Sequence, residues 1–410
     1  MMFLQYFIWG TWSVTLATYL GRTLAFTPVQ IGLAYTTGAT AAIVSPFFVG
    51  MVADRFFATE RVLALLHLAG ALLLWSAAVL PHFVPLYLAL LGYALVFMPT
   101  LPLTNALCFA HLPDPATDFP RVRVLGTLGW IVAGLLVGQL ALEATPVPLR
   151  IAALASAGMA GFCLLLPHTP PLGGRRATGA TRPTPPRGWP RVRGLLGLDA
   201  LGLLRDRELA IFVAACFLIC IPLQFYGVFT NLYFNEIGMR AAAAKMTLGQ
   251  ATEGACTLLL PFLYPRLGVK RLMLLGTSAW VLRYILLAFG GPGAGEALLL
   301  GAVLLHGACY VFILLTGQIY IEQKAEPRVR ASAQGLFSLV TSGLGCLIGG
   351  LAAGRVVQAM TSAPAGVLVH DWRGIWLVPA VAALAVLLLF ATSFRPGRPA
   401  AAGPLPAPAD

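Results

Sequence analysis

The stretch HTPPLGGRRATGATRPTPPRGWPRVRG, residues 168–194, divides the chain into two apolar parts. It is rich in Pro, Gly and Arg and has almost no periodicity, which is typical of a flexible linker. Eight arginines lie between Arg175 and Arg207. A basic connector between two apolar parts indicates the cytoplasmic side of a membrane. The sequence LLGLDALGLLRD (195–206) predicts a short amphipathic helix at the membrane interface.

The composition of the chain supports a membrane protein. Of the 410 residues, 59% are hydrophobic and 10% are charged, and the mean hydropathy is +0.83. Soluble domains carry about 25% charged residues, so this chain has too little polar surface to cover a water-soluble globule. Runs of roughly 20 apolar residues can cross a bilayer. Twelve such runs are found, at about 3–21, 31–53, 62–80, 85–108, 122–142, 148–167, 209–230, 246–265, 271–289, 297–320, 331–352 and 374–394.

The runs fall into two groups of six, one on each side of the linker. The sequence therefore predicts an all-α polytopic membrane protein with twelve transmembrane helices in two six-helix bundles. We expect an N-terminal bundle over 1–167 and a cytoplasmic basic linker with the short interfacial helix over 168–208. A C-terminal bundle over 209–394 and a disordered cytoplasmic tail over 395–410 complete the expected organisation.

The placement of the basic residues predicts the orientation. With the linker on the cytoplasmic side, 19 Lys and Arg residues fall on that side and 6 on the other. This bias predicts that both termini are cytoplasmic. The formal net charge of +12 then reflects membrane orientation, and we expect no nucleic acid as a partner. The seven cysteines lie in or beside apolar runs without metal-ligand spacing, so we interpret them as packing residues.

Glu253 stands in the middle of a predicted span, within TLGQATEGACTLLLPF (247–262). Placing a carboxylate in hydrocarbon costs roughly 2.5–3.5 kcal/mol on insertion scales, so such residues usually mark a pathway. Burial favours the neutral form of a carboxylate, which can bring proton binding into the physiological range. Two interpretations remain open. Glu253 either carries a proton and contacts substrate, or it is a structural carboxylate paired with another helix.

A short loop pattern follows the second predicted span. The sequence GMVADRFFATERVL (50–63) places Gly50, Asp54 and Arg55 in the G-x-x-x-D-R pattern that resembles the major facilitator superfamily. Glycine permits a close helix approach, and the aspartate can pair with basic groups or a helix N-terminus. We interpret these three residues as gating residues that hold one face of the transporter closed.

Several further segments resemble the bacterial nucleoside:proton symporters, the nucleoside and xanthosine permeases of this superfamily. The likeness runs from FLQYFIWGTW (3–12) to DWRGIWLV (371–378). Between these ends it is carried by TDFPRVRVLGTLGWI (117–131), LLGLDALGLLRDRELAIF (195–212), GQATE (249–253), RLGVKRLMLLGTSAWVLRY (266–284) and RVRASAQGLF (328–337).

The resemblance implies a monomeric carrier in the bacterial cytoplasmic (inner) membrane with one central cavity and alternating access. Its partners would be purine or pyrimidine nucleosides, protons and the lipid bilayer, with protons as the coupling ion and no cofactor. An enzyme is not expected, because the sequence has no nucleophile motif, no histidine cluster of metal spacing and no Gly-rich phosphate loop.

The resemblance also implies substrate-binding residues. Gln250 and Glu253 share one helix face at i and i+3, and ribose hydroxyls are natural partners for an amide and a carboxylate. Arg123, Thr127 and Trp130 form one stripe of the fifth span, where arginine can donate to a base carbonyl and tryptophan can stack on a base. The alternatives are that Arg123 snorkels to the interface and that Trp130 packs against lipid or protein.

The seventh span carries a further polar residue of the family. Gln224 can read a base edge with a donor and an acceptor, or it can hydrogen-bond to another helix. Asn231 shares its face but lies near the outer end. Gly227 departs from the family, which has an asparagine at this position, so base selectivity is open.

The tenth span departs from the family at Val311, where the resemblance implies an acidic residue. His306 and Tyr310 share a face of this span at i and i+4, and Tyr310 either stacks on substrate or packs. Glu253 alone can couple transport to protons, or His306 can contribute, since an unperturbed imidazole titrates near about pH 6.5. The protein can also be an uncoupled nucleoside facilitator. Arg283, in the ninth span, is expected to be structural, paired with an acidic group or the outer interface.

Two functions from other classes remain. A sensor derived from a transporter would bind nucleosides without moving them, and uptake measurements distinguish it. An exporter of the same superfamily would need fewer convergent polar groups in its cavity, and a resistance phenotype would favour it.

Overall fold

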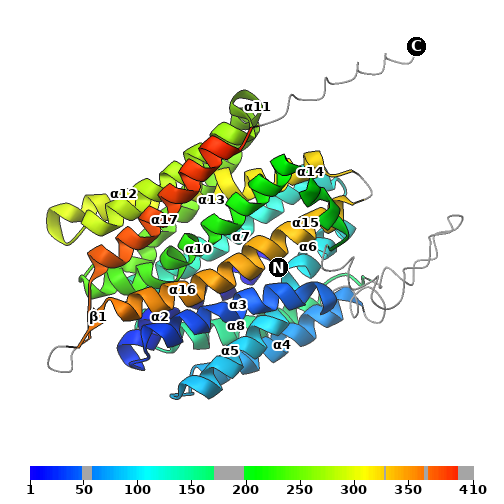
Figure 1. Ribbon diagram of the computed structural model, residues 1–410. Coiled ribbons are helices and arrows are strands. Elements are labelled where there is room, and N and C mark those ends of the chain that lie inside the picture. The colour runs from blue at the N-terminus through cyan, green and yellow to red at the C-terminus, as the bar shows by residue number, and fades with distance from the viewer. Residues whose placement is uncertain (49–57, 170–197, 327–328, 364–367, 396–410) are drawn as a thin grey trace, which may run out of the picture.

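The computed structural model describes residues 1–48, 58–169, 198–326, 329–363 and 368–395, and this part of the chain is a bundle of long helices (Figure 1). In these ranges nine helical stretches are long and apolar enough to cross a membrane. One of them, α11 (Ala242–Phe289), contains two of the predicted spans. The segment Met2–Thr23 and helix α3 supply the remaining two. The predicted all-α class with twelve membrane helices is confirmed.

The N-terminal half consists of the elements before the linker. They are α1 (Met2–Ser13), α2 (Leu16–Thr18), the π-helical turn η1 (Tyr19–Thr23), α3 (Pro28–Phe48), α4 (Thr59–Ala77), α5 (Phe83–Phe97), α6 (Thr100–His111), α7 (Pro115–Gln139) and α8 (Val147–Leu164). Helices α5 and α6 together form the fourth span, and Pro99 stands at their junction, where it supplies no backbone N–H to continue the first helix.

The C-terminal half begins with η4 (Leu198–Arg205), a 3-10 helix within the segment predicted to be a short interfacial helix. Its other elements are α10 (Arg207–Glu236), α11, η5 (Gly293–Gly295), α12 (Glu296–Leu304), α13 (His306–Tyr310), the π-helical turn η6 (Val311–Leu315), α14 (Thr316–Lys324), α15 (Arg330–Ser338), the π-helical turn η7 (Leu339–Gly345), α16 (Cys346–Ala359), β1 (Thr361–Ser362), β2 (Val369–His370) and α17 (Trp372–Ser393). Strands β1 and β2 form a small antiparallel hairpin, with Thr361 paired to His370.

Helix α11 differs from the two separate spans expected over 246–265 and 271–289. Its two parts are joined at a single non-helical residue, Gly268, which has φ +69° and ψ +169°. This conformation is accessible essentially only to glycine. A Cβ added to Gly268 would meet no atom within 4 Å, so the backbone conformation and not space requires glycine here.

A buried polar network holds the N-terminal half together. Gln5 Nε2 donates to Thr100 Oγ1 at 2.6 Å, and Gln5 Oε1 lies 3.0 Å from His67 Nε2. His67 Nδ1 lies 3.3 Å from Ser156 Oγ. These four residues come from α1, α4, α6 and α8. Because buried polar groups in a membrane bundle need partners, the network fixes the four helices relative to one another.

The two halves meet along seams of glycine. Helix α3 packs against α16, and α7 packs against α11, so the orange α16 lies beside the blue α3 in Figure 1. A Cβ added to Gly32 would lie 2.5 Å from Gly350 O, and one added to Gly138 would lie 2.4 Å from Ala244 N. Small residues therefore allow the backbones of the two halves to approach within contact distance.

Hydrogen bonds between the halves are found at the end of the bundle that holds the connections 140–146 and 237–241, here called the latch end. The carboxylate of Glu143 is 4% exposed and accepts from Ala243 N at 2.8 Å and from Asn231 Nδ2 at 3.1 Å. Asn235 Nδ2 donates to the same carboxylate. Thr18 Oγ1 donates to Asn231 Oδ1 at 2.6 Å. The structure is thus closed at the latch end.

Candidate functional site

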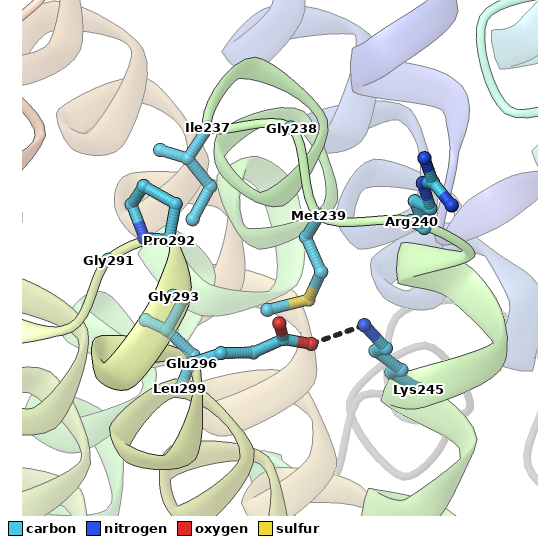
Figure 2. A pocket seen from close by; sticks show the side chains of 10 residues that line it. All are labelled: Ile237, Gly238, Met239, Arg240, Lys245, Gly291, Pro292, Gly293, Glu296 and Leu299. Carbon is cyan, nitrogen blue, oxygen red and sulfur yellow. Dashed lines mark hydrogen bonds and ion pairs between the residues drawn. The ribbon is translucent and has the colours of Figure 1, made fainter.

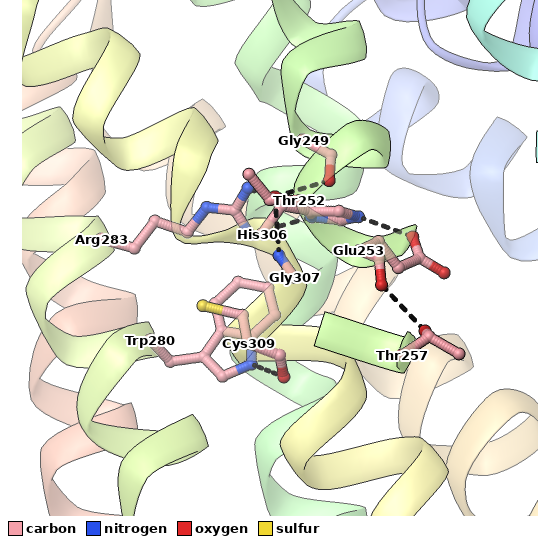
Figure 3. A network of polar contacts seen from close by, with 9 residues as sticks. All are labelled: Gly249, Thr252, Glu253, Thr257, Trp280, Arg283, His306, Gly307 and Cys309. Carbon is pink, nitrogen blue, oxygen red and sulfur yellow. Dashed lines mark hydrogen bonds and ion pairs between the residues drawn. The ribbon is translucent and has the colours of Figure 1, made fainter. Parts of the chain in front are cut away.

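A polar cluster lies at half depth in the C-terminal half, on the side that meets the N-terminal half. Glu253 follows the start of α11 at Ala242 by eleven residues, which is about 16 Å of helix. Its side chain is 33% exposed, so it is not sealed in apolar packing. Figure 3 shows that Glu253 and Arg283, from the two parts of α11, both lie against His306 of α13.

Close approach of α11 and α13 brings the cluster together. A Cβ added to Gly307 would lie 2.2 Å from Thr252 O, and one added to Gly249 would lie 3.0 Å from His306 Cβ. The span is interrupted between α12 and α13, and the Gly307 N–H donates to Thr252 Oγ1 at 3.2 Å. Thr252 Oγ1 in turn donates to Gly249 O at 2.8 Å. Two glycines and one threonine thereby place His306 beside Glu253.

His306 lies between an acidic side chain, Glu253, and a basic side chain, Arg283. Its Nε2 is 3.5 Å from Glu253 Oε2. Its Nδ1 is 3.2 Å from both Nη1 and Nη2 of Arg283 (Figure 3). Two aromatic rings lie roughly parallel to the imidazole, with the Tyr226 centroid at 5.8 Å and the Tyr310 centroid at 6.0 Å. The imidazole ring therefore has one nitrogen toward each charged group.

Arg283 was expected to pair with an acidic group or with the outer interface, and the structure places it elsewhere. It is 0% exposed, and its guanidinium lies over the Tyr226 ring, 3.3 Å from the centroid. The Trp280 ring centroid is 5.0 Å away. Two of its nitrogens lie 3.2 Å from His306 Nδ1, and the side chains of Tyr226 and Cys309 are further polar neighbours. A buried arginine is costly unless it is hydrogen-bonded, so aromatic faces and an imidazole stabilise this cation.

The N-terminal half contributes Arg123 to the same region. The Arg123 guanidinium lies 4.3 Å from the centroid of the Tyr6 ring. Tyr6 interacts electrostatically with both Arg123 and Glu253, and Tyr310 interacts with both Glu253 and Tyr6. Arg123 from one half therefore contacts an aromatic residue on α1 that also lies within electrostatic range of Glu253 from the other half.

The remaining sequence-predicted residues are distributed around this region. Trp130 packs its ring edge against Trp9, with centroids 5.4 Å apart, and contacts Gly10, so part of its surface serves helix packing. Thr127 and Gln250 are partly exposed. Gln224 is also partly exposed, and its stem packs against Gly349.

Tyr310 and Val311 lie next to each other in the chain but point into different surroundings. Tyr310 is 39% exposed, which leaves ring surface free. Val311 is 1% exposed and belongs to an apolar cluster with Leu260, Leu272 and Phe312. The position at which the family resemblance implies an acid is therefore occupied by an apolar side chain in apolar packing.

Sequence reasoning did not select Tyr6, Tyr226 or Thr252. Aromatic and hydroxyl residues are common in membrane helices, so nothing in their spacing distinguishes them. The gating residues Gly50, Asp54 and Arg55 lie outside the described residues, and their role remains a prediction.

A separate cavity of about 260 Å³ lies at the latch end (Figure 2). Its lining comes from the connections 237–240 and 291–293 together with Lys245, Glu296 and Leu299. Lys245 Nζ and Glu296 Oε1 form an ion pair across it. Because these charges satisfy each other and none of the polar cluster lines this cavity, it is not the site described above.

Comparison with known proteins agrees with this arrangement. The nucleoside H⁺ symporter family matches residues 1–398. The Escherichia coli (strain K12) protein YegT is 40% identical over 406 residues, covering 96% of this chain and 92% of the relative. The xanthosine permease of the same organism is 34% identical over 410 residues, covering 96% and 94%.

A solved structure shows the same fold. The crystal structure of the nucleoside transporter NupG superposes with a TM-score of 0.86 at 32% identity, covering 97% of this chain and 98% of that chain. The match spans both halves of the chain. The relatives named here are transporters and not enzymes. The chain is a multi-pass membrane transporter of the major facilitator fold and belongs to the nucleoside H⁺ symporter family.

Proposed function

We propose that this protein takes up nucleosides across the bacterial inner membrane by alternating access, coupled to the entry of protons. The observation that carries the proposal is the partly exposed carboxylate of Glu253 at half depth, beside His306 and facing the N-terminal half. A carboxylate in this place is costly, and a transport role explains why it is there. The names of the relatives, a xanthosine permease and a nucleoside transporter, support nucleosides as the substrate class.

Residues of both halves would bind the nucleoside. Glu253 and Gln250 accept and donate hydrogen bonds suited to ribose hydroxyls, while Gln224 and Arg123 can pair with base edges. Tyr310 offers free ring surface for stacking, since 39% of the residue is exposed. Thr127 and Trp130 complete the stripe on α7.

Glu253 would be the main protonatable group, with His306 at its side. In this scheme the protein is a monomer, both termini are cytoplasmic, and protons are the coupling ion without a cofactor. The latch end then faces the outside of the cell. The closed latch end corresponds to a state that is shut toward the outside, and rocking of the halves opens it.

Uptake of labelled uridine and adenosine into proteoliposomes tests this function. Accumulation above equilibrium only with an inward proton gradient supports a symporter. Equilibration with and without the gradient would support the uncoupled facilitator, which the apolar packing of Val311 favours as the second candidate. Absence of flux for both nucleosides would contradict nucleoside transport and direct attention to a sensor or an exporter.

A further inference from the structure

Arg283 determines which nitrogen of His306 carries a proton. The guanidinium group has only donors, and two of its nitrogens lie 3.2 Å from His306 Nδ1. Nδ1 must therefore be the acceptor. A neutral imidazole has a single N–H, which is then on Nε2. Nε2 is the atom that lies 3.5 Å from Glu253 Oε2.

Protonation of Nδ1 is opposed by the guanidinium of Arg283, which lies against this atom. It would remove the acceptor from two hydrogen bonds and place an additional donor against a buried cation. The groups that face the ring are Arg283 and Glu253 on the two parts of α11, Tyr226 on α10, and Tyr310 on the turn that follows His306. Only Glu253 among these is an anion, and it faces Nε2.

Arg283 cannot easily turn away from the imidazole. Its guanidinium lies 3.3 Å from the Tyr226 centroid on one side of the cluster, and Trp280 lies alongside. The Trp280 ring is itself fixed, because its Nε1 donates to Cys309 O at 3.0 Å (Figure 3). The cation is thus clamped by aromatic faces in the orientation that presents its donors to His306.

We propose that Arg283 is a positioning residue for proton coupling, an inference that rests on the proposed symport function. Arg283 holds His306 as the neutral tautomer with its proton on Nε2. His306 then presents a fixed donor to Glu253, and the transported proton binds to Glu253 alone. A single carboxylate is sufficient for coupling, and no second titrating group at position 311 is needed.

The proton balance of this scheme is simple. Protonation of Glu253 forms one O–H bond and removes its negative charge. Release of that proton to the opposite side restores the carboxylate, which a small side-chain adjustment places within hydrogen-bond distance of the Nε2–H. His306 neither gains nor loses a proton, because its Nε2 already carries one and its Nδ1 lone pair is occupied by Arg283.

The protonation state of His306 can be measured directly by nitrogen NMR of the full chain in lipid, with ¹⁵N-labelled histidine. The chain has six histidines, and the His306→Gln variant identifies the signal of His306 by difference. We expect protonated Nε2 and unprotonated Nδ1 throughout the range around about pH 6.5 in which free histidine titrates. A proton on Nδ1, or an imidazolium within that range, would overturn the proposal in the wild-type protein itself.

A variant of Arg283 tests whether this arginine is what keeps His306 neutral. In Arg283→Leu we expect His306 to titrate, while Arg373→Leu, which removes an exposed arginine that lies over Phe289, leaves the His306 signal unchanged. If Arg283→Leu folds, shown by retained nucleoside binding, and His306 still does not titrate, Arg283 is not the positioning residue. If Arg283→Leu does not fold, the tautomer of His306 measured in the wild-type protein decides whether the proposal holds.

Transport measurements distinguish whether His306 is a fixed hydrogen-bond donor or itself carries the proton. The glutamine of His306→Gln keeps an N–H donor but cannot titrate. In His306→Gln we expect slower uptake, with gradient-driven accumulation of nucleoside retained. In His306→Leu, which has no donor to hold Glu253, we expect gradient-driven accumulation to fall at least about tenfold. Loss of accumulation in His306→Gln with counterflow intact would show that His306 itself carries the proton. Failure of the wild type to accumulate nucleoside would contradict the symport function, whereas the tautomer measurement would still decide the role of Arg283.

Discussion

At the scale of single residues, the carboxylate of Glu253 is explained by its neighbours. It lies beside His306 at 3.5 Å and interacts with Tyr6 on the other half, and one third of its side chain is exposed. A purely structural carboxylate at this depth would be expected to pair directly with a cation. Here the imidazole of His306 lies between Glu253 and the buried cation Arg283.

The first prediction concerns the charge of Glu253. In Glu253→Gln the side chain keeps its shape and an acceptor but cannot bind a proton. We expect gradient-driven accumulation of uridine to be lost, and nucleoside affinity to fall about tenfold because a hydrogen bond to a charged group is replaced by a neutral one. Counterflow in proteoliposomes measures the remaining exchange. Glu296→Gln, in the latch-end cavity, is the matched control with coupling retained, and full accumulation in Glu253→Gln would contradict the role of this residue.

The second prediction concerns Val311. Its side chain is 1% exposed among Leu260, Leu272 and Phe312. Val311→Asp places an unpaired carboxyl in this cluster, so we expect the melting temperature in detergent to fall by about 2–5 °C. Val311→Leu, which remains apolar, serves as the comparison. An aspartate that leaves the melting temperature unchanged would mean that position 311 reaches polar surroundings.

At the scale of elements, hydropathy predicts where the spans lie but not how they are interrupted. The twelve apolar runs correspond to the membrane helices, because apolar length is what a bilayer selects. The joining of two spans at Gly268 depends on one backbone conformation, and the break before His306 depends on the contact of Gly307 with Thr252. Neither interruption can be predicted from hydropathy, because both interruptions depend on tertiary packing.

The third prediction tests the break in α11. Gly268 has φ +69° in open space, so Gly268→Ala adds strain without a clash. We expect a loss of stability of about 1–3 kcal/mol. Gly161→Ala in α8, which also has open space around it but lies within a helix, should be neutral or stabilising by up to about 1 kcal/mol. Reversible unfolding in mixed detergent compares the two. Equal effects would show that Gly268 does not need its left-handed conformation.

At the scale of the whole molecule, closure of the latch end depends on glycine seams and on Glu143. The seam of α7 and α11 and the bonds from Glu143 to Asn231 and Ala243 lie at the same end. The site was predicted only in part from the sequence. Glu253 and His306 stand out because ionisable residues are rare in spans, whereas Arg283 was assigned a structural role because its partner is brought to it only by folding.

The fourth prediction concerns this closure. In Gly138→Leu the new Cβ would lie 2.4 Å from Ala244 N, which is backbone and cannot yield. Overpacking costs about 1–3 kcal/mol, so the ratio of closed to open molecules falls about tenfold. We expect a longer distance between spin labels at Arg150→Cys and Arg240→Cys in a cysteine-free background, and slower uptake. Gly158→Leu, which has no atom within 4 Å of its Cβ, is the control. An unchanged distance distribution would contradict closure at this seam.

Proton movement caused by a nucleoside is the most direct test of proton symport through Glu253. Wild-type protein and Glu253→Gln are placed in proteoliposomes that contain a pH-sensitive dye, with equal pH on both sides, and uridine is added outside. We predict acidification of the lumen that follows uridine entry in the wild type, and uridine equilibration without acidification in Glu253→Gln. Uridine entry into wild-type vesicles without proton movement, or proton movement that persists in Glu253→Gln, would contradict proton symport through this carboxylate.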